Sequence, residues 1–240
     1  MGLLDIFAKK DSPAAIKKHA ARVANKRSQT PDRWESIKAL REAGGQAAAE
    51  ALLPRFDYKV DPSISDREEK DYVVECLVHM GDAALPAVRA HLHNSDSIAW
   101  PLRVLTQLLD EDGVVTELLA VAADMSAEYE RFPEKKIQVL AELEERRDPR
   151  IAPAVLPFVR DMNENARYHA VGALLRQEEA ADFVEGVMDA FLEEESARIR
   201  ATVLDRLADA GLGVGPRQPE VAAHMPPGYK LDAAGVPQRT

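Results

Sequence analysis

The chain has 240 residues, of which 46% are apolar, 30% charged and 5% aromatic, and its formal net charge is -10. A single cysteine excludes an internal disulfide framework. No apolar run approaches the roughly 20 residues that a membrane-spanning helix needs. The first ten residues place their apolar side chains before their lysines, the reverse of a secretory signal, so the sequence predicts a cytoplasmic location.

The charge is unevenly distributed, because residues 1–33 carry eight Lys and Arg against three acids while the remainder is strongly acidic. An acidic body repels phosphates, which disfavours a nucleic-acid partner. Residues 1–30 predict a basic capping segment, with an amphipathic helix over 11–28. Four apolar residues precede this helix, and we name them the apolar tip: Leu3, Leu4, Ile6 and Phe7. The tip is predicted to pack onto the first repeat or onto a partner. Contact with a membrane surface is the alternative.

Beyond residue 30 an apolar pair recurs six times, with Ile, Val or Leu followed three residues later by Leu. The steps between successive pairs are 37, 31, 35, 31 and 33 residues. A period of this length is typical of stacked helix pairs. Three repeats place a glycine seven residues after the first member, where a left-handed helix cap is expected. The pairs are Ile37/Leu40, Val74/Leu77, Leu105/Leu108, Leu140/Leu143, Val171/Leu174 and Leu204/Leu207, and the glycines are Gly44, Gly81 and Gly211.

Each of the first five repeats is predicted to hold an A-helix, which carries the apolar pair, and a B-helix. In chain order the A-helices are 32–43, 66–80, 98–110, 133–146, 166–176 and 197–210. The B-helices are 46–56, 83–93, 114–123, 151–162 and 179–195. Residues 211–240 hold five prolines and five glycines, which predicts an irregular Pro/Gly-rich tail in which Tyr229 and Leu231 contact the last repeat.

The junctions before several helices carry a further pattern, as in Asp148-Pro149-Arg150-Ile151, Glu164-Asn165-Ala166-Arg167 and Ser196-Ala197-Arg198-Ile199. With the leucine pattern, they resemble the HEAT-repeat family in its short bacterial form, which includes phycobilisome-lyase-type repeats. The resemblance covers about residues 31–210. It implies an all-α fold, a right-handed α-α superhelix of about six helix pairs.

The resemblance implies an armadillo-like surface for protein binding, so the leading hypothesis is a non-catalytic scaffold whose B-helices hold a segment of another protein. A preformed groove loses little entropy on binding. No cofactor or metal ion is predicted. The acidic run of 178–195 is interpreted as a solvated face or as one wall of that groove. The predicted partner-binding residues are Arg55, Arg89, His93, Arg160, Glu179, Asp182, Glu185 and Asp189.

Two enzyme hypotheses remain as alternatives. A lyase-type HEAT enzyme or accessory predicts a small pocket with a histidine or carboxylate of shifted pKa. A DNA-glycosylase-like enzyme predicts a basic groove with Trp, Arg and Asp, for which the nearest candidates are Trp100, Arg103 and Asp110, and the acidic body opposes it. His91, His93 and Asp96 are interpreted as solvated helix-end residues rather than as a metal site.

Overall fold

The structure is a computed structural model that describes residues 12–240, so the predicted apolar tip, Leu3, Leu4, Ile6 and Phe7, lies outside the described residues. The described chain is mostly helical with little strand, which confirms the all-α prediction. It divides into two compact units, Met1–Val114 and Val115–Thr240. None of the helices in the described part combines the length and apolarity that crossing a bilayer requires.

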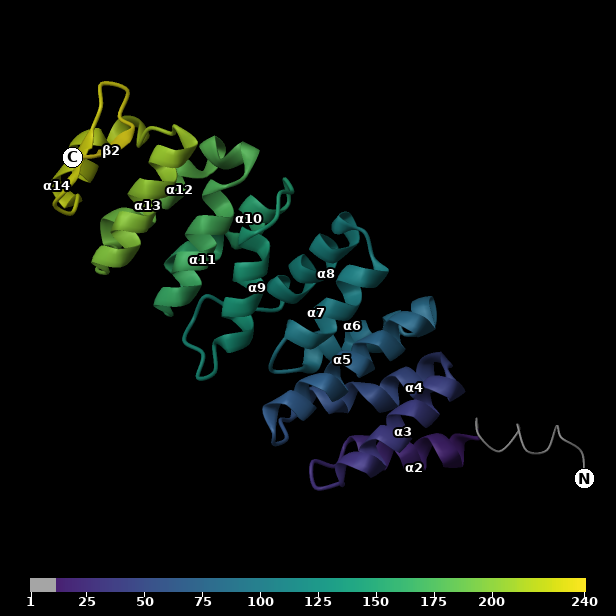
Figure 1. Ribbon diagram of the computed structural model, residues 1–240. Coiled ribbons are helices and arrows are strands. Elements are labelled where there is room, and N and C mark those ends of the chain that lie inside the picture. The colour runs from purple at the N-terminus through teal and green to yellow at the C-terminus, as the bar shows by residue number, and fades with distance from the viewer. Residues whose placement is uncertain (1–11) are drawn as a thin grey trace, which may run out of the picture. The chain divides into compact units, whose positions relative to one another are not determined.

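In the first unit the predicted A-helices form one layer and the B-helices a second (Figure 1). Helix α5 contacts both α3 and α7, α4 contacts α6, and α2 packs on α3 and α4. The N-terminal capping helix thus covers the first pair. The elements are α2 Pro13–Val23, α3 Thr30–Ala43, α4 Gly45–Leu52, η1 Leu53–Asp57, α5 Ser63–Met80, η2 Gly81–Ala83, α6 Leu85–Asn94 and α7 Ala99–Leu108.

The second unit repeats this arrangement, with α9, α11 and α13 side by side (Figure 1) and α12 packed on η3 and α14. Helix α8, Glu111–Ala123, contains the point where the units divide. The elements are α9 Glu134–Glu144, α10 Ile151–Val155, η3 Leu156–Arg160, α11 Glu164–Leu175, η4 Glu178–Phe183, α12 Val184–Glu193, α13 Ala197–Ala210, η5 Gly215–Arg217, α14 Gln218–His224, β1 Tyr229–Leu231 and β2 Pro237–Arg239.

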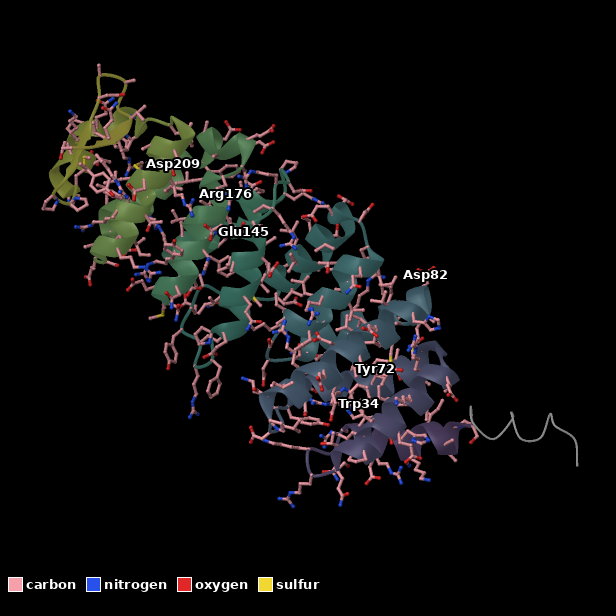
Figure 2. All side chains as sticks on the ribbon, viewed as in Figure 1. Trp34, Tyr72, Asp82, Glu145, Arg176 and Asp209 are labelled. Atoms are coloured by element: carbon pink, nitrogen blue, oxygen red, sulfur yellow. The ribbon has the colours of Figure 1, made fainter. Side chains whose placement is uncertain are left out.

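The recurring apolar pairs belong to the core of each unit. Of their twelve members, only Leu108 is not fully buried. Trp34, on α3, lies against Tyr72 of α5 with their ring centroids 5.1 Å apart (Figure 2), so aromatic contact joins neighbouring A-helices. Burying a side chain of the size of leucine stabilises a fold by about 1.5–3 kcal/mol. The pattern found in the sequence therefore contributes packing energy to each unit, together with the other buried apolar residues.

Glycine ends three A-helices where the sequence predicts it. Gly44, Gly81 and Gly211 have φ of 66°, 58° and 65°, a region that side-chain-bearing residues rarely adopt. At Gly211 the N–H donates to the carbonyl of Ala208 at 3.1 Å, which closes the last turn of α13. These caps set the lengths of the A-helices, so the predicted ends at 43, 80 and 210 coincide with the observed ones.

Three B-helices differ from the prediction of one continuous helix. Residues 46–56 divide into α4 and η1, and 151–162 divide into α10 and η3. Pro54 and Pro157 lie at these divisions. A proline lacks the N–H that an α-helix needs, and the 3-10 turn accommodates its absence. Residues 179–195 divide into η4 and α12 without a proline, and nothing in the structure explains that break.

The C-terminal tail is more regular than predicted. Residues 211–240 form η5, α14 and a two-stranded antiparallel sheet in which Tyr229 pairs with Arg239. The Tyr229 hydroxyl donates to Asp205 Oδ1 at 2.8 Å, and Arg239 Nε donates to the same oxygen at 2.8 Å. These bonds attach the sheet to α13, as expected for Tyr229. The superhelical course of the whole chain stays a prediction.

Candidate functional site

A cation recurs at one position of the A-helices, four residues before the first member of the apolar pair. Five repeats have Lys or Arg there, and the third has Pro101. Three of the five are at most 3% exposed. A buried cation costs free energy unless it is paired, so each of these needs acceptors nearby. The spacing is visible in the sequence, but a search for apolar periodicity does not find it. The cations are Arg33, Lys70, Lys136, Arg167 and Arg200.

In the second unit Lys136 fixes the shape of the loop between α8 and α9. Its ammonium group donates to the carbonyl oxygens of Ser126 at 2.8 Å and Glu128 at 3.4 Å. The same group forms an ion pair with Asp161, with 2.7 Å between Lys136 Nζ and Asp161 Oδ2. Both side chains are buried, so this pair is shielded from solvent. The loop is therefore held by its own helix and by the segment after η3.

This loop presents two large side chains to solvent, Tyr129 at 75% and Phe132 at 69% exposed. Met162, 63% exposed, belongs to the same region because its N–H donates to the carbonyl of Ala127 at 3.0 Å. The guanidinium carbon of Arg131 lies 5.1 Å from the centre of the Phe132 ring. Aromatic residues, Met and Arg are enriched in protein interfaces. We name Tyr129, Phe132 and Met162 the aromatic surface.

Acidic residues flank the aromatic surface on two sides. On the loop side, residues 124–136 contain four acids against Arg131, Lys135 and the buried Lys136, which also pairs with Glu130 at 3.5 Å. On the other side, Arg160 pairs with Glu193 at 3.4 Å, which brings the acidic end of α12 towards the segment that carries Met162. Mixed apolar and acidic character favours a partner segment that combines apolar and basic side chains. The acids of the loop are Asp124, Glu128, Glu130 and Glu134.

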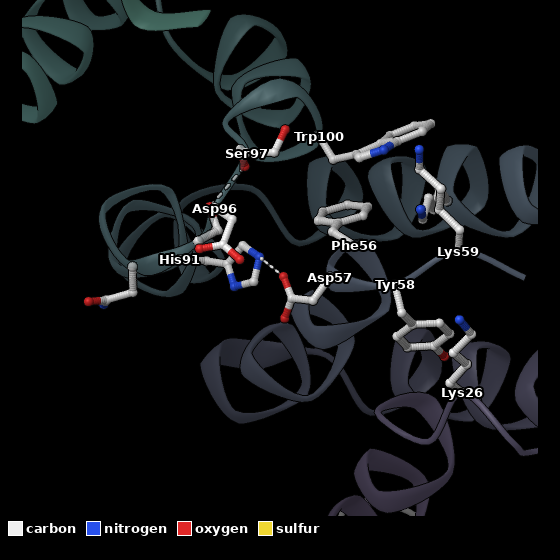
Figure 3. A pocket seen from close by; sticks show the side chains of 12 residues that line it. Lys26, Phe56, Asp57, Tyr58, Lys59, His91, Asp96, Ser97 and Trp100 are labelled. Carbon is white, nitrogen blue, oxygen red and sulfur yellow. Dashed lines mark hydrogen bonds and ion pairs between the residues drawn. The ribbon is translucent and has the colours of Figure 1, made fainter. Parts of the chain in front are cut away.

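In the first unit, an open pocket of about 870 Å³ lies where the turns after η1 and α6 meet the N-terminal parts of α5 and α7 (Figure 3). We name it the first-unit pocket. Its volume falls within the range of about 300–1,000 Å³ that small-molecule sites occupy. It is lined by Lys26, Phe56, Asp57, Tyr58, Lys59, Lys70, His91, Asn94, Ser95, Asp96, Ser97 and Trp100.

One wall of this pocket is aromatic and the facing side carries a His–Asp pair. Phe56 stacks on Trp100 with centroids 5.7 Å apart and planes at 12°. His91 Nε2 lies 3.0 Å from Asp57 Oδ1 (Figure 3). Burial raises the pKa of the Asp57 carboxyl, and His91 opposes this by stabilising the ionised form. His91 is thus half-buried and paired, which corrects its interpretation as a solvated helix-end residue.

The eight predicted partner-binding residues do not form one site. Arg55 is fully buried and donates to Glu69 at 2.7 Å and Asp66 at 2.8 Å, so the prediction that it contacts a partner is wrong. It holds the first unit together because its charge requires those carboxylates. Arg89 is exposed and His93 half-buried, both on α6, and neither lines the first-unit pocket.

The other five predicted residues lie in the second unit near the α12 region. Arg160 is exposed and pairs with Glu193, and Asp189 pairs with Arg217 at 2.5 Å. Asp189 therefore contributes to attaching the tail near η5 as well as to the acidic face. The acids at 179, 182 and 185 lie on η4 and α12, and two of them are exposed; they are Glu179, Asp182 and Glu185.

Of the residues suggested for a glycosylase-like reaction, Trp100 and Arg103 lie together, and Asp110 forms its hydrogen bond with neither of them. Arg103 lies over the ring of Trp100 at 4.7 Å and donates to Asp71 at 2.7 Å. Asp110 accepts a hydrogen bond from the N–H of Gly113 at 2.9 Å and does not line the first-unit pocket.

Cys76 is buried, and burial raises the pKa of its thiol to about 12, which leaves the thiol protonated at neutral pH.

In comparisons with known proteins, no family model, no curated protein and no solved structure matches this chain.

Proposed function

We propose that this protein is a helical-repeat module that binds a partner protein through the aromatic surface. The observation that carries the proposal is the loop at Tyr129 and Phe132, whose backbone is held by the buried Lys136. Exposed apolar residues that gather in one patch with a polar rim are typical of interaction sites, whereas most exposed apolar residues are scattered singly. Since the loop is already ordered, binding requires little further loss of conformational entropy.

The partner segment is expected to be apolar with basic flanking residues. The acids around the aromatic surface attract such a segment and repel an acidic one. Rim charges act mainly on the association rate and are screened by salt, while the buried aromatic contacts set the residence time. Binding should therefore weaken gradually with ionic strength and fall steeply when an aromatic side chain is removed. The HEAT-like superhelix would supply the frame for this surface, and that relationship is part of the proposal.

The test is retention of partners from a lysate of the source cells on the immobilised full chain and on two variants. Phe132→Ser removes an aromatic anchor. Ile64→Ser is the matched control, because Ile64 is 70% exposed and belongs to the first unit, whereas the loop belongs to the second. The expected result is a protein that wild type and Ile64→Ser retain and Phe132→Ser does not. Equal retention by all three, or retention of nothing above a bare matrix, would contradict the proposal.

One observation favours the lyase-type alternative as a second candidate. The first-unit pocket contains a histidine beside a carboxylate of raised pKa, the combination that this hypothesis predicts. His91 and Asp57 could move a proton within the pocket, and His91→Gln would then abolish turnover while leaving the fold intact. A reaction class does not follow from these two groups, so the binding function is the better supported proposal.

A further inference from the structure

Several charged residues around the first-unit pocket occupy corresponding positions in their repeats to residues that form ion pairs within a repeat of the second unit. There, the cation of an A-helix pairs with the acid that follows the B-helix of the same repeat. Lys136 pairs with Asp161 at 2.7 Å, and Arg167 pairs with Glu194 at 2.7 Å and 3.0 Å. The members of these pairs are 25 and 27 residues apart. Each pair ties the end of a B-helix to its own A-helix.

The first unit has a cation and an acid at corresponding places, one residue closer in the sequence, but does not pair them. Asp57 ends η1, 24 residues after Arg33, and Asp96 follows α6, 26 residues after Lys70. Arg33 instead binds Glu69, with two contacts of 2.9 Å, and Asp57 binds His91.

Lys70 likewise turns away from the acid of its own repeat. It binds Asp66 one helical turn earlier, with 3.0 Å between Lys70 Nζ and Asp66 Oδ2. Asp57, Lys70 and Asp96 all line the pocket. Acids that pair with a cation of their own repeat in the second unit therefore have counterparts that line the pocket in the first unit.

The wall that carries Lys59 is fixed on both sides of that residue. Arg55 donates to the carbonyl of Tyr58 at 3.2 Å, and the Tyr58 hydroxyl donates to the carbonyl of Val23. On the other side, the N–H of Val60 donates to Asp66 Oδ1 at 3.0 Å. The backbone of Lys59 is therefore held by the buried ion network of the unit. A site built on such a backbone keeps its shape when a ligand is absent.

The lysine side of the pocket is positive in a protein of net charge -10. Lys26 and Lys59 are exposed, and within residues 12–240 neither forms an ion pair with a carboxylate. Burial lowers the pKa of the nearby Lys70. Asp66 opposes this effect, and the positive charges of Arg55 and Lys59 add to it. An anion placed there would relieve this repulsion between cations.

The opposite side of the pocket holds acceptors and hydroxyl groups. Asp96 is exposed, and Asn94, Ser95 and Ser97 lie beside it on the same turn. Carboxylates repel an anion but accept hydrogen bonds from hydroxyl groups. Figure 3 places Asp96 and His91 on one side of the pocket and Lys59 and Lys26 on the other. A ligand that fits both sides has an anionic group at one end and hydroxyl donors at the other.

We propose that the first-unit pocket binds a small hydroxylated organic anion, with its phosphate or carboxylate group at Lys26 and Lys59 and its hydroxyl groups at Asp96. The inference rests on the open charge pairs of the first unit and is independent of the aromatic surface. Each charge-assisted hydrogen bond contributes more than a neutral one, so removing a single lysine should weaken binding about tenfold.

The test uses the ¹⁵N-labelled full chain and four probes: glucose 6-phosphate, gluconate, glucose and inorganic phosphate. Glucose 6-phosphate, gluconate or both should shift the amide signals of residues 57–60 and 94–97 with a Kd below about 1 mM. The two anions distinguish a phosphate from a carboxylate. Glucose lacks the anionic group and inorganic phosphate lacks the hydroxyl groups, so each should bind at least about tenfold more weakly.

Two variants and one control locate the site. Lys59→Met should weaken the anionic sugar about tenfold, and Asp96→Asn should weaken it about fivefold without affecting inorganic phosphate. Lys230→Met is the control, because Lys230 is also exposed but lies on β1 of the second unit. The proposal is overturned if no probe shifts these signals at about 10 mM. Equal binding by wild type and Lys59→Met, or by glucose 6-phosphate and inorganic phosphate, also overturns it.

Discussion

The two units place a cation at the same position of their A-helices and then pair it differently. In the second unit Lys136 and Arg167 bind acids that follow their own B-helices. In the first unit, Arg33 and Lys70 bind acids on α5. The acids that follow the B-helices of that unit, Asp57 and Asp96, line a pocket instead. The comparison shows that each buried charge needs a partner, but that its position in the repeat does not determine which partner it takes. That freedom allows the second unit to pair these charges within a repeat and the first to place polar groups around a pocket.

The largest effect is expected from Glu69→Gln in the first unit. Glu69 accepts from Arg33 and from Arg55, and all three side chains are at most 2% exposed. Removing the carboxylate charge leaves two buried guanidinium groups short of a partner, which should destabilise the unit by about 3–5 kcal/mol.

Hydrogen exchange resolved by segment measures this effect. Protection should fall over 30–108 and persist over 134–210, because the network lies within the first unit. A uniform loss across the chain, or a change below about 1 kcal/mol, would show that the network is not the organising contact of that unit.

Lys136→Met and Lys70→Met form a matched pair across the two units. Without Lys136, the buried Asp161 loses its ion-pair partner, so a cost of about 3 kcal/mol is expected. Without Lys70, Asp66 still accepts from Arg55 and from the N–H of Val60, so a cost of about 1 kcal/mol is expected. Urea denaturation followed by circular dichroism gives both values.

The same two variants can be compared in the partner-retention assay. Lys136→Met should also reduce partner retention at the aromatic surface, since the loop loses the ammonium group that orders it, while Lys70→Met should leave retention unchanged. Equal stability losses in the two variants would contradict the view that only the second unit depends on the pair within its own repeat.

Gly172→Ala tests the contacts of a further buried carboxylate, Glu144, in the second unit. Glu144 accepts from His169 Nδ1 at 2.8 Å and from Arg206 Nη2 at 2.6 Å. A Cβ at Gly172 would lie 2.2 Å from Glu144 Oε1, so the carboxylate must move and its bonds weaken. A cost of about 1–3 kcal/mol is expected.

The control for this substitution is Gly186→Ala, also within a helix. There the nearest atom is a methyl carbon of Leu156 at 3.2 Å, at the end of a side chain that can adjust. Thermal unfolding of both variants measures the two costs. For Gly186→Ala a cost below about 1 kcal/mol is expected, because helix propensity favours alanine over glycine. If both variants lose equal stability, the contact with Glu144 is not the cause.

The sequence predicted what apolar periodicity and glycine caps determine, and missed what depends on contacts between distant residues. The A-helix ends at Gly44, Gly81 and Gly211 follow from local geometry, so they could be predicted. The aromatic surface depends on the ordering of its loop by Lys136, eight to ten residues from the carbonyls that it binds. Nothing in the local sequence of Tyr129 or Phe132 reports that ordering.

The error at Arg55 has a related cause. An arginine near a helix end is usually exposed, and the carboxylates that bury it lie eleven and fourteen residues later, on α5. The first-unit pocket was also inaccessible to sequence reasoning, because its lining comes from five separate segments. Pairing of the recurring cations could have been anticipated from their spacing of four residues before each apolar pair, but the choice of partner could not.

The smallest effect is the acid sensitivity of the first unit, which differs in origin from that of the second. Burial alone would raise the pKa of Asp66, but hydrogen bonds from Arg55, Lys70 and the Val60 N–H outweigh it and lower the pKa. In the second unit, hydrogen bonding from Arg239 lowers the pKa of Asp205. Each carboxylate therefore binds a proton less readily when folded than unfolded, where the Asp pKa is about 3.9.

The sign of the effect follows from this difference. Stability from either carboxylate is fully present above the unfolded pKa and is lost as pH falls through the lower folded pKa. Urea midpoints between pH 6 and pH 3 should therefore decline, with a shallower decline in Asp66→Asn for the first unit. Asp205→Asn should release only the C-terminal sheet from α13, because its partners Tyr229 and Arg239 belong to that sheet. If Asp66→Asn kept the wild-type slope, the ion network on α5 would not be what distinguishes the first unit at low pH.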